Sequence, residues 1–206
     1  DLPGKPPVWQ LICAVCAAVP GLRIRLGSLE PRIVTEEFVR ALAAYPNLCP
    51  QFHLSMQSGS DTVLARMNRK YTAEEYLASL NRLREAFPGC AVTTDMIVGF
   101  PGETEAEFEE SLAFIQKCAF AEMHIFPYSR RPGTPAADMP GQLGNAVKEA
   151  RSHAAIAVVR RMSESYRRGI IGTTQQLLVE GMEDGFSVGH AMNYVKIYLP
   201  GEFPRN

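Results

Sequence analysis

Apolar residues in the first 130 positions alternate between two spacings along the chain. Spacings of three and four predict helices, and apolar residues at every second position predict half-buried strands. Strand centres fall roughly 30–40 residues apart with a helix between each pair, which is typical of βα units in a parallel sheet or barrel. The four predicted strands cover residues 23–26, 52–56, 91–98 and 122–126.

Helices are predicted between and before these strands. Pro20-Gly21 and Pro46 end two of them, and Thr72 with Glu75 forms a capping box that opens another. Thr104 with Glu107 repeats the capping-box pattern. The predicted helices cover residues 8–19, 38–45, 63–67, 72–83 and 104–115.

The pattern changes after Phe126. Residues 127–143 are rich in proline and glycine and predict a loop. Residues 146–168 predict one long helix, and its apolar side is expected to carry Ala150, Ala154, Ala157 and Val158. Short strands at 176–179 and 193–199, with a turn at Asp184-Gly185, look like the opening of a small β-barrel with too few strands to close. We therefore divide the chain into a domain at 1–172 and the start of a second domain at 173–206.

Composition narrows the class of protein. The chain has 206 residues, of which 46% are hydrophobic, which excludes a largely disordered protein. No apolar run is long enough for a membrane-spanning helix, so no membrane association is expected. Five irregularly spaced cysteines favour a reducing, cytoplasmic location over a secreted disulfide framework. The chain begins at Asp1 and not at methionine, so we expect it to be processed or cut from a longer protein.

Charge is unevenly distributed although the formal net charge is only −1. Residues 95–122 hold seven acidic residues and one lysine, whereas residues 123–170 hold eight basic residues and three acidic ones. Two interpretations remain open: two solvated helix faces, or a basic surface that binds a polyanion.

Polar residues gather where the predicted strands end. Ser28 and Glu30 follow the first strand, Gln57 follows the second, Asp95 lies within the third, and Arg69 closes the short helix after Gln57. In parallel α/β folds, function collects at the carboxyl ends of the strands. Two carboxylates, an amide and a guanidinium there suit a zwitterionic ligand that carries hydroxyls. The pattern alone leaves open that Glu30 and Arg69 only cap helices or form salt bridges.

The run from Asp95 to Thr104 is a second candidate. Gly99 and Gly102 would let the backbone approach a ligand, and the next helix offers its N-terminus. The alternative is an ordinary junction between a strand and a well-capped helix.

Four segments resemble the conserved blocks of one family, in the same order. They are RIRLGSLEP (23–31), HLSMQSGSDTVLARMNRKY (53–71), TTDMIVGFPGET (93–104) and FPYSRRPGTPAADMPGQ (126–142). The family is the radical S-adenosylmethionine methylthiotransferases, and residues 176–201 resemble the start of its RNA-binding TRAM domain. The run RMNRKYT is most similar to the branch that modifies threonylcarbamoyladenosine in tRNA, and the ribosomal-protein branch typically has histidine in place of Ser58.

The resemblance implies a role for individual residues. Glu30, Gln57, Arg69 and Asp95 match positions that hold S-adenosylmethionine, and Ile97 matches a position near its adenine. Arg69 would bind the methionine carboxylate, Asp95 and Gln57 the ribose, and Glu30 the amino or ribose side; Ser28 is included from its place at the strand end. Two loop arginines, Arg130 and Arg131, are candidates for contact with RNA, with ordinary exposed loop residues as the alternative.

One family feature is missing from the sequence. Radical S-adenosylmethionine enzymes hold a [4Fe–4S] cluster through a C-x3-C-x2-C run, which this chain lacks. Cys13 and Cys16 lie in an apolar predicted helix and are expected to be core residues rather than ligands. We therefore expect no metal ligand and no catalytic residue here, with the cluster-binding segment upstream of Asp1.

The resemblance predicts the back half of a radical S-adenosylmethionine barrel followed by the start of a TRAM domain. The full protein would insert a methylthio group at C2 of N6-threonylcarbamoyladenosine 37, beside the tRNA anticodon, using S-adenosylmethionine and iron–sulfur clusters, and this piece alone would be inactive. Alternatives are the isopentenyladenosine or ribosomal-protein branch, and a tRNA-binding module without chemistry. An aldolase-type barrel would need a catalytic lysine, and Lys5, Lys70 and Lys117 are poorly placed. The open sheet edge predicts possible dimerisation.

Overall fold

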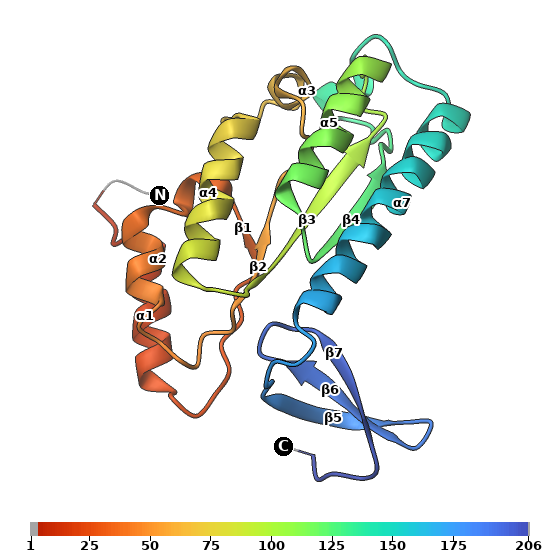
Figure 1. The fold of residues 1–206 in the computed structure, drawn as a ribbon. Coiled ribbons are helices and arrows are strands. Elements are labelled where there is room, and N and C mark those ends of the chain that lie inside the picture. The colour runs from red at the N-terminus through yellow and green to blue at the C-terminus, as the bar shows by residue number, and fades with distance from the viewer. Residues whose placement is uncertain (1–3, 206) are drawn as a thin grey trace.

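Four parallel strands form the main sheet of the computed structural model, which describes residues 4–205. The spatial order β1-β2-β3-β4 follows the order along the chain (Figure 1). The strands are β1 (Ser28–Leu29), β2 (Gln51–Leu54), β3 (Ala91–Val98) and β4 (Glu122–Pro127). This arrangement confirms the predicted α/β class with a parallel sheet.

Helices connect the strands, as the periodicity predicts. Both predicted capping boxes are present: Thr72 accepts the backbone N–H of Glu75, and Thr104 accepts that of Glu107. The helical elements are α1 (Val8–Ala18), the 3-10 turn η1 (Pro31–Ile33), α2 (Glu36–Leu42), α3 (Asp61–Arg66), α4 (Ala73–Ala86), α5 (Glu105–Cys118), α6 (Pro135–Asp138) and α7 (Asn145–Gly169). No helix within residues 4–205 combines the length and apolar character needed to cross a membrane.

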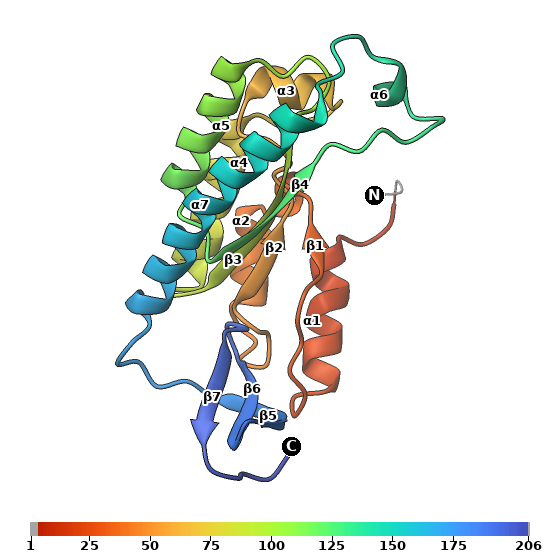
Figure 2. The ribbon, with the colours of Figure 1, turned by 90° about the vertical axis from the view of Figure 1, so that its right-hand side faces the viewer.

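Helices α4, α5 and α7 cover one face of the main sheet, and α1 lies beside β1, away from them (Figure 2). Residues of β3 alternate accordingly: Val92, Thr94, Met96 and Val98 are buried, and Thr93, Asp95 and Ile97 are only partly buried. The face opposite these three helices, which we call the open face, is therefore where polar side chains of the strands remain available to a ligand.

The first strand differs from the prediction. Residues 23–26 are not a strand; Ile24 makes only an isolated bridge with Leu48, and the ladder with β2 begins at Ser28. The alternating pattern at 23–26 marks extended backbone, but a strand also needs a partner at successive positions. Ser28 consequently lies inside β1 and does not follow it.

The long helix is confirmed, but the predicted buried side is mostly wrong. Ala150, Ala154 and Ala157 are exposed, and only Val158 of the predicted set is buried. The buried positions are Arg151, Ser152, Ala155, Val158, Val159 and Ser163. Alanine gives a weak periodic signal, and an ion pair of Arg151 described below brings a charged residue onto the inner side.

The final part of the chain forms a three-stranded antiparallel sheet, which we call the tail sheet. Its strands are β5 (Leu177–Glu183), β6 (Phe186–Ala191) and β7 (Lys196–Pro200). It lies at the end of the main sheet where β2, β3 and β4 begin (Figure 1). Arg23 joins the two parts by donating to the carbonyls of Gln176 and His190, both at 2.9 Å.

Candidate functional site

A hollow of about 490 Å³ lies at the carboxyl ends of β3 and β4. It brings together four of the residues singled out from the sequence: Gln57, Asp95, Ile97 and Arg131. The remaining lining residues are Phe126, Pro127, Tyr128, Ser129, Thr134 and Ala136. The hollow therefore combines a carboxylate, an amide and a guanidinium with an apolar wall.

Gln57 reaches this hollow because the chain turns sharply after β2. Its φ of 67° is left-handed, a conformation that costs a non-glycine residue on the order of 1–3 kcal/mol. Its N–H donates to the carbonyl of Asp95 at 3.0 Å, and its carbonyl accepts from the N–H of Ile97 at 2.9 Å. These two bonds hold the backbone of Gln57 against β3, and the hollow is lined by both Gln57 and Asp95.

Asp95 points from β3 into the open side of the sheet. Its side chain is 28% exposed, and one carboxylate oxygen lies 3.3 Å from Nε2 of His53 on β2. No role for His53 is predicted from the sequence, because its partner lies far away in the chain. Register supplies the missing information: His53 pairs with Thr93, two residues before Asp95 on the same face.

The apolar wall of the hollow is formed by Ile97 and Phe126. These residues are register partners on β3 and β4, so their side chains lie on the same face of the sheet. Phe126 is 50% exposed, which is unusual for a large apolar side chain in a sheet. An exposed aromatic ring next to a carboxylate suits a ligand with one flat apolar part and one polar part.

Three predicted ligand residues lie outside this hollow. Ser28 is exposed on β1, and Glu30 forms an ion pair at 2.8 Å with Arg32. Arg69 is exposed, and Tyr71 beside it donates its hydroxyl to the carbonyls of Ser55 and Met56. Burial raises the pKa of Tyr71, with a smaller lowering by Arg69 and a raising by Glu30. Glu30 and Arg69 thus both act on Tyr71, at the end of β2, and not in the hollow.

The two loop arginines lie in different surroundings in the structure. Arg131 lines the hollow, whereas Arg130 is exposed and lies 4.0 Å from Asp138. Both stay candidates for RNA contact, with Arg131 alone adjacent to the proposed ligand site.

The glycine-containing loop after β3 is held by a buried ion pair. The Glu103 carboxylate accepts the N–H of Gly99 at 2.6 Å and a guanidinium N–H of Arg151 at 2.7 Å. Burial raises the pKa of the Glu103 carboxyl, against a lowering by Gly99 and Arg151. A Cβ on Gly99 would lie 2.6 Å from Cγ of Lys148, so this glycine permits close packing of α7. The structure therefore favours the simpler interpretation of this run, a tightly packed strand–helix junction.

The cysteines do not form a metal site. Cys16, Cys49, Cys90 and Cys118 are buried in separate segments of the chain, and burial raises the pKa of Cys90 to about 11 and that of Cys118 to about 12. Among residues 4–205, no three His, Cys, Asp or Glu side chains are placed to hold a metal ion together. The thiols of this chain therefore do not fit an iron–sulfur cluster, and we derive no step through one.

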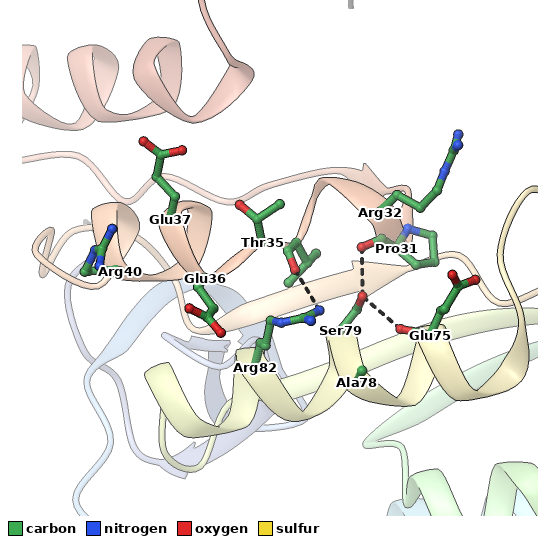
Figure 3. Close-up of a pocket in the computed structure, with 11 residues that line it drawn as sticks. Pro31, Arg32, Thr35, Glu36, Glu37, Arg40, Glu75, Ala78, Ser79 and Arg82 are labelled. Atoms are coloured by element: carbon green, nitrogen blue, oxygen red, sulfur yellow. Dashed lines mark hydrogen bonds between the residues drawn. The ribbon is translucent and has the colours of Figure 1, made fainter.

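A larger groove of about 700 Å³ lies on the helical side, between η1, α2 and α4 (Figure 3). Its polar contacts are internal: Ser79 donates to the carbonyl of Pro31 at 2.9 Å, and Arg82 donates to that of Val34 at 3.4 Å. Acidic and basic side chains line it in similar numbers, as Figure 3 shows. These contacts fasten η1 and α2 to α4, and they give no indication of a ligand.

A parallel βα sheet with a polar hollow at its carboxyl edge is the arrangement of barrel-type α/β enzymes. Residues 4–115 match the model of the Radical SAM superfamily, which is more than half of the chain. The chain belongs to this superfamily, as the sequence blocks indicated.

Curated relatives carry more specific names. The chain is 42% identical over 181 residues to a tRNA-2-methylthio-N(6)-dimethylallyladenosine synthase of Corynebacterium urealyticum, covering 87% of this chain and 34% of that protein. It is 42% identical over 198 residues to the threonylcarbamoyladenosine tRNA methylthiotransferase MtaB of Bacillus subtilis, covering 93% of this chain and 44% of the relative. The chain thus spans less than half the length of these relatives.

A solved structure supports the fold. The radical SAM enzyme coproporphyrinogen III oxidase (HemN) from Escherichia coli superposes with a TM-score of 0.62 at 17% identity, covering 89% of this chain and 49% of that one. At that identity the likeness concerns the fold alone.

Proposed function

We propose that the protein containing this chain is a tRNA methylthiotransferase and that the chain forms part of its S-adenosylmethionine pocket. The observation that carries the proposal is the hollow, where Gln57, Asp95 and Ile97 meet. Membership of the Radical SAM superfamily and the names of both relatives support the same activity.

Each residue of the hollow has a binding role in this proposal. Asp95 accepts hydrogen bonds from ribose hydroxyls, and the Gln57 amide adds a second polar contact. Ile97 and Phe126 provide an apolar wall for the adenine ring. Bound S-adenosylmethionine would supply the radical chemistry and the methyl group of a methylthio transfer.

Glu30 and Arg69 complete the proposed pocket at the end of the neighbouring strand. Arg69 is exposed and free to meet a carboxylate, which a guanidinium binds well. Glu30 would meet the amino or ribose side after leaving its surface contact with Arg32, a pair expected to contribute little stability. Ser28, exposed on β1, has the least support of the proposed set.

For the substrate, we propose N6-threonylcarbamoyladenosine 37 in the anticodon stem-loop of tRNA. The run RMNRKYT and the MtaB relative support this choice. The second candidate is dimethylallyladenosine, which is favoured by the name of the Corynebacterium relative. Arg131, and with it Arg130, would contact the RNA beside the hollow.

The remaining proposals concern the setting of the enzyme. We propose domain boundaries at 1–172 and 173–206, with the tail sheet as the start of a TRAM-type RNA-binding domain. Cytoplasmic location follows from action on tRNA, and dimerisation through the sheet edge stays a prediction.

Nucleoside analysis of tRNA tests both the activity and the substrate. Deleting the gene in the source organism should remove one methylthio nucleoside, and mass spectrometry identifies which one. Reintroducing the wild-type gene should restore it, and a gene carrying Asp95→Asn should not. A gene carrying Lys117→Gln, an exposed position in the last turn of α5, should restore it. Unchanged levels of both methylthio nucleosides in the deletion strain would refute the proposed activity.

A further inference from the structure

A line of polar side chains runs along the open face of the sheet to Asp95. It begins at Arg25, which donates to Oε1 of Gln51 at 3.2 Å. Nε2 of Gln51 donates to the hydroxyl of Thr93 at 3.2 Å. That hydroxyl lies 3.1 Å from Nδ1 of His53. Nε2 of His53 then lies 3.3 Å from Asp95, so four contacts join the arginine to the carboxylate.

The arginine end of this line determines its direction. A guanidinium can only donate, so the oxygen of the Gln51 amide faces Arg25 and its NH₂ faces Thr93. The Thr93 hydroxyl accepts from Gln51 and so donates to Nδ1 of His53, which leaves the imidazole proton on Nε2, the nitrogen that lies 3.3 Å from the Asp95 carboxylate. Nδ1 is then an acceptor, and the Thr93 hydroxyl supplies its hydrogen bond. Gln51, Thr93 and His53 can therefore each accept from one neighbour in the line and donate to the other.

Burial and strand register hold the side chains of this line in defined positions. Gln51 is 3% exposed, and the side chain of His53 is 17% exposed. Gln51 pairs with Ala91 and His53 with Thr93 in the β2–β3 ladder, which places the polar side chains in successive layers. The register partner of Asp95 on β4, His124, is exposed and has no polar contact assigned within the described residues.

We infer that His53 is a positioning residue that holds the Asp95 carboxylate in the orientation needed to bind ribose hydroxyls. This inference rests on the proposed function, since it requires Asp95 to touch the ligand. Asp95 lines the hollow, so with one oxygen beside His53 the other oxygen would be left to accept from the ligand. The Thr93 hydroxyl keeps the imidazole in the tautomer that can donate to Asp95.

The same line reaches the tail sheet. The guanidinium of Arg25 stacks over the ring of Tyr194 at 4.0 Å, and that ring stacks in turn on His190 at 4.3 Å. The donor end of the line is thus held by an aromatic clamp outside the barrel part of the chain.

Calorimetric binding of S-adenosylhomocysteine to the full-length holoenzyme tests the inference. His53→Leu should weaken binding about tenfold, the loss expected when a polar contact to a charged group is removed. His53→Gln, whose amide nitrogen can take the place of Nε2, should recover most of the affinity. Thr93→Val should weaken binding in the same direction by a smaller factor. His153→Leu, an exposed position on α7, should bind like the wild type.

Combination with Asp95→Asn separates the two levels of the proposal. If His53 acts through Asp95, the double variant His53→Leu/Asp95→Asn should bind no more weakly than Asp95→Asn alone. Additive losses, full affinity of His53→Leu, or no recovery in His53→Gln would each overturn the positioning role while leaving the function intact. Wild-type affinity of Asp95→Asn would instead refute the proposed pocket itself. Melting temperatures measured without ligand show whether any variant has lost its fold. If His53→Leu does not fold, the affinity of Thr93→Val decides whether the positioning role holds.

Discussion

Replacing Arg151 by methionine should destabilise the protein far more than a typical change on a basic helix. The Arg151 side chain is 6% exposed and that of its partner Glu103 is fully buried. The guanidinium donates to the Glu103 carboxylate at 2.7 Å and to its backbone carbonyl at 3.0 Å. Methionine keeps most of the apolar stem and removes the charged head, which also pairs at 3.0 Å with the exposed carboxylate of Glu105, a contact expected to contribute little.

The expected magnitude follows from the charge that would be left behind. Removing one partner of a buried ion pair costs about 3–5 kcal/mol, because the other charge stays buried without compensation. Glu103 would keep one hydrogen bond, from the N–H of Gly99. Because this bond compensates for part of the charge, we expect a loss near the lower limit, about 3 kcal/mol in the free energy of unfolding at neutral pH.

Acidity should modulate this loss in a definite direction. Burial raises the pKa of Glu103 even with Arg151 present, and the variant should raise it further. A carboxyl whose folded pKa lies above its unfolded value destabilises the fold increasingly as the pH rises between the two. The cost of Arg151→Met should therefore be smaller at pH 5 than at pH 7.

Urea unfolding followed by far-ultraviolet circular dichroism measures these values. Arg160→Met, an exposed position on the same helix, is the matched control and should change stability by less than about 0.5 kcal/mol. Adding Glu103→Gln to Arg151→Met should recover much of the loss, since the neutral amide still accepts from Gly99. Equal stability of the Arg151→Met and Arg160→Met variants would refute the assignment of a buried, energetically coupled pair.

Three further outcomes are expected. Glu107→Gln should make the stability of the protein less dependent on acidic pH. Arg66 lowers the pKa of Glu107, so the stabilisation by this carboxylate is present above the ordinary glutamate pKa and is lost as the pH falls. Melting temperatures measured across acidic pH values would detect the difference. Gly189→Ala should open the tail sheet to limited proteolysis and leave the main sheet intact, because its Cβ would lie 1.8 Å from the carbonyl oxygen of Leu178; an unaltered cleavage pattern contradicts this. Cys118, with its pKa raised to about 12, should resist thiol reagents at pH 8 until the protein unfolds, whereas Cys13, the half-buried cysteine of α1, should react first.

Local signals in the sequence predicted the elements well. The capping boxes at Thr72 and Thr104 and the full length of β3 were assigned correctly, because each depends on residues close together in the chain. The first strand was misplaced because pairing with β2, not alternation, decides where a strand forms.

Long-range partners explain the rest of the differences. Arg151 is one of the eight basic residues at 123–170, for which a solvated helix face and a polyanion-binding surface were both left open, and only its contact with Glu103, 48 residues away, explains why it is buried. His53 received no role because its partner Asp95 is defined by strand register. Gln57, Asp95 and Ile97 were found from strand ends and the family resemblance, and the hollow brings them together. Glu30 lies outside the hollow and pairs with Arg32, which agrees with the salt-bridge alternative that the pattern left open.

The tail sheet and the hollow lie close to one another along β3. Thr93 lines a cleft together with His190 and Tyr194 of the tail sheet, and Asp95, two residues further along the same face, lines the hollow. Two residues of a strand span roughly 7 Å, at about 3.3 Å per residue. A substitution in the tail sheet can therefore change ligand binding in the hollow without touching the ligand, and the two parts of the chain are expected to respond to a ligand as one unit.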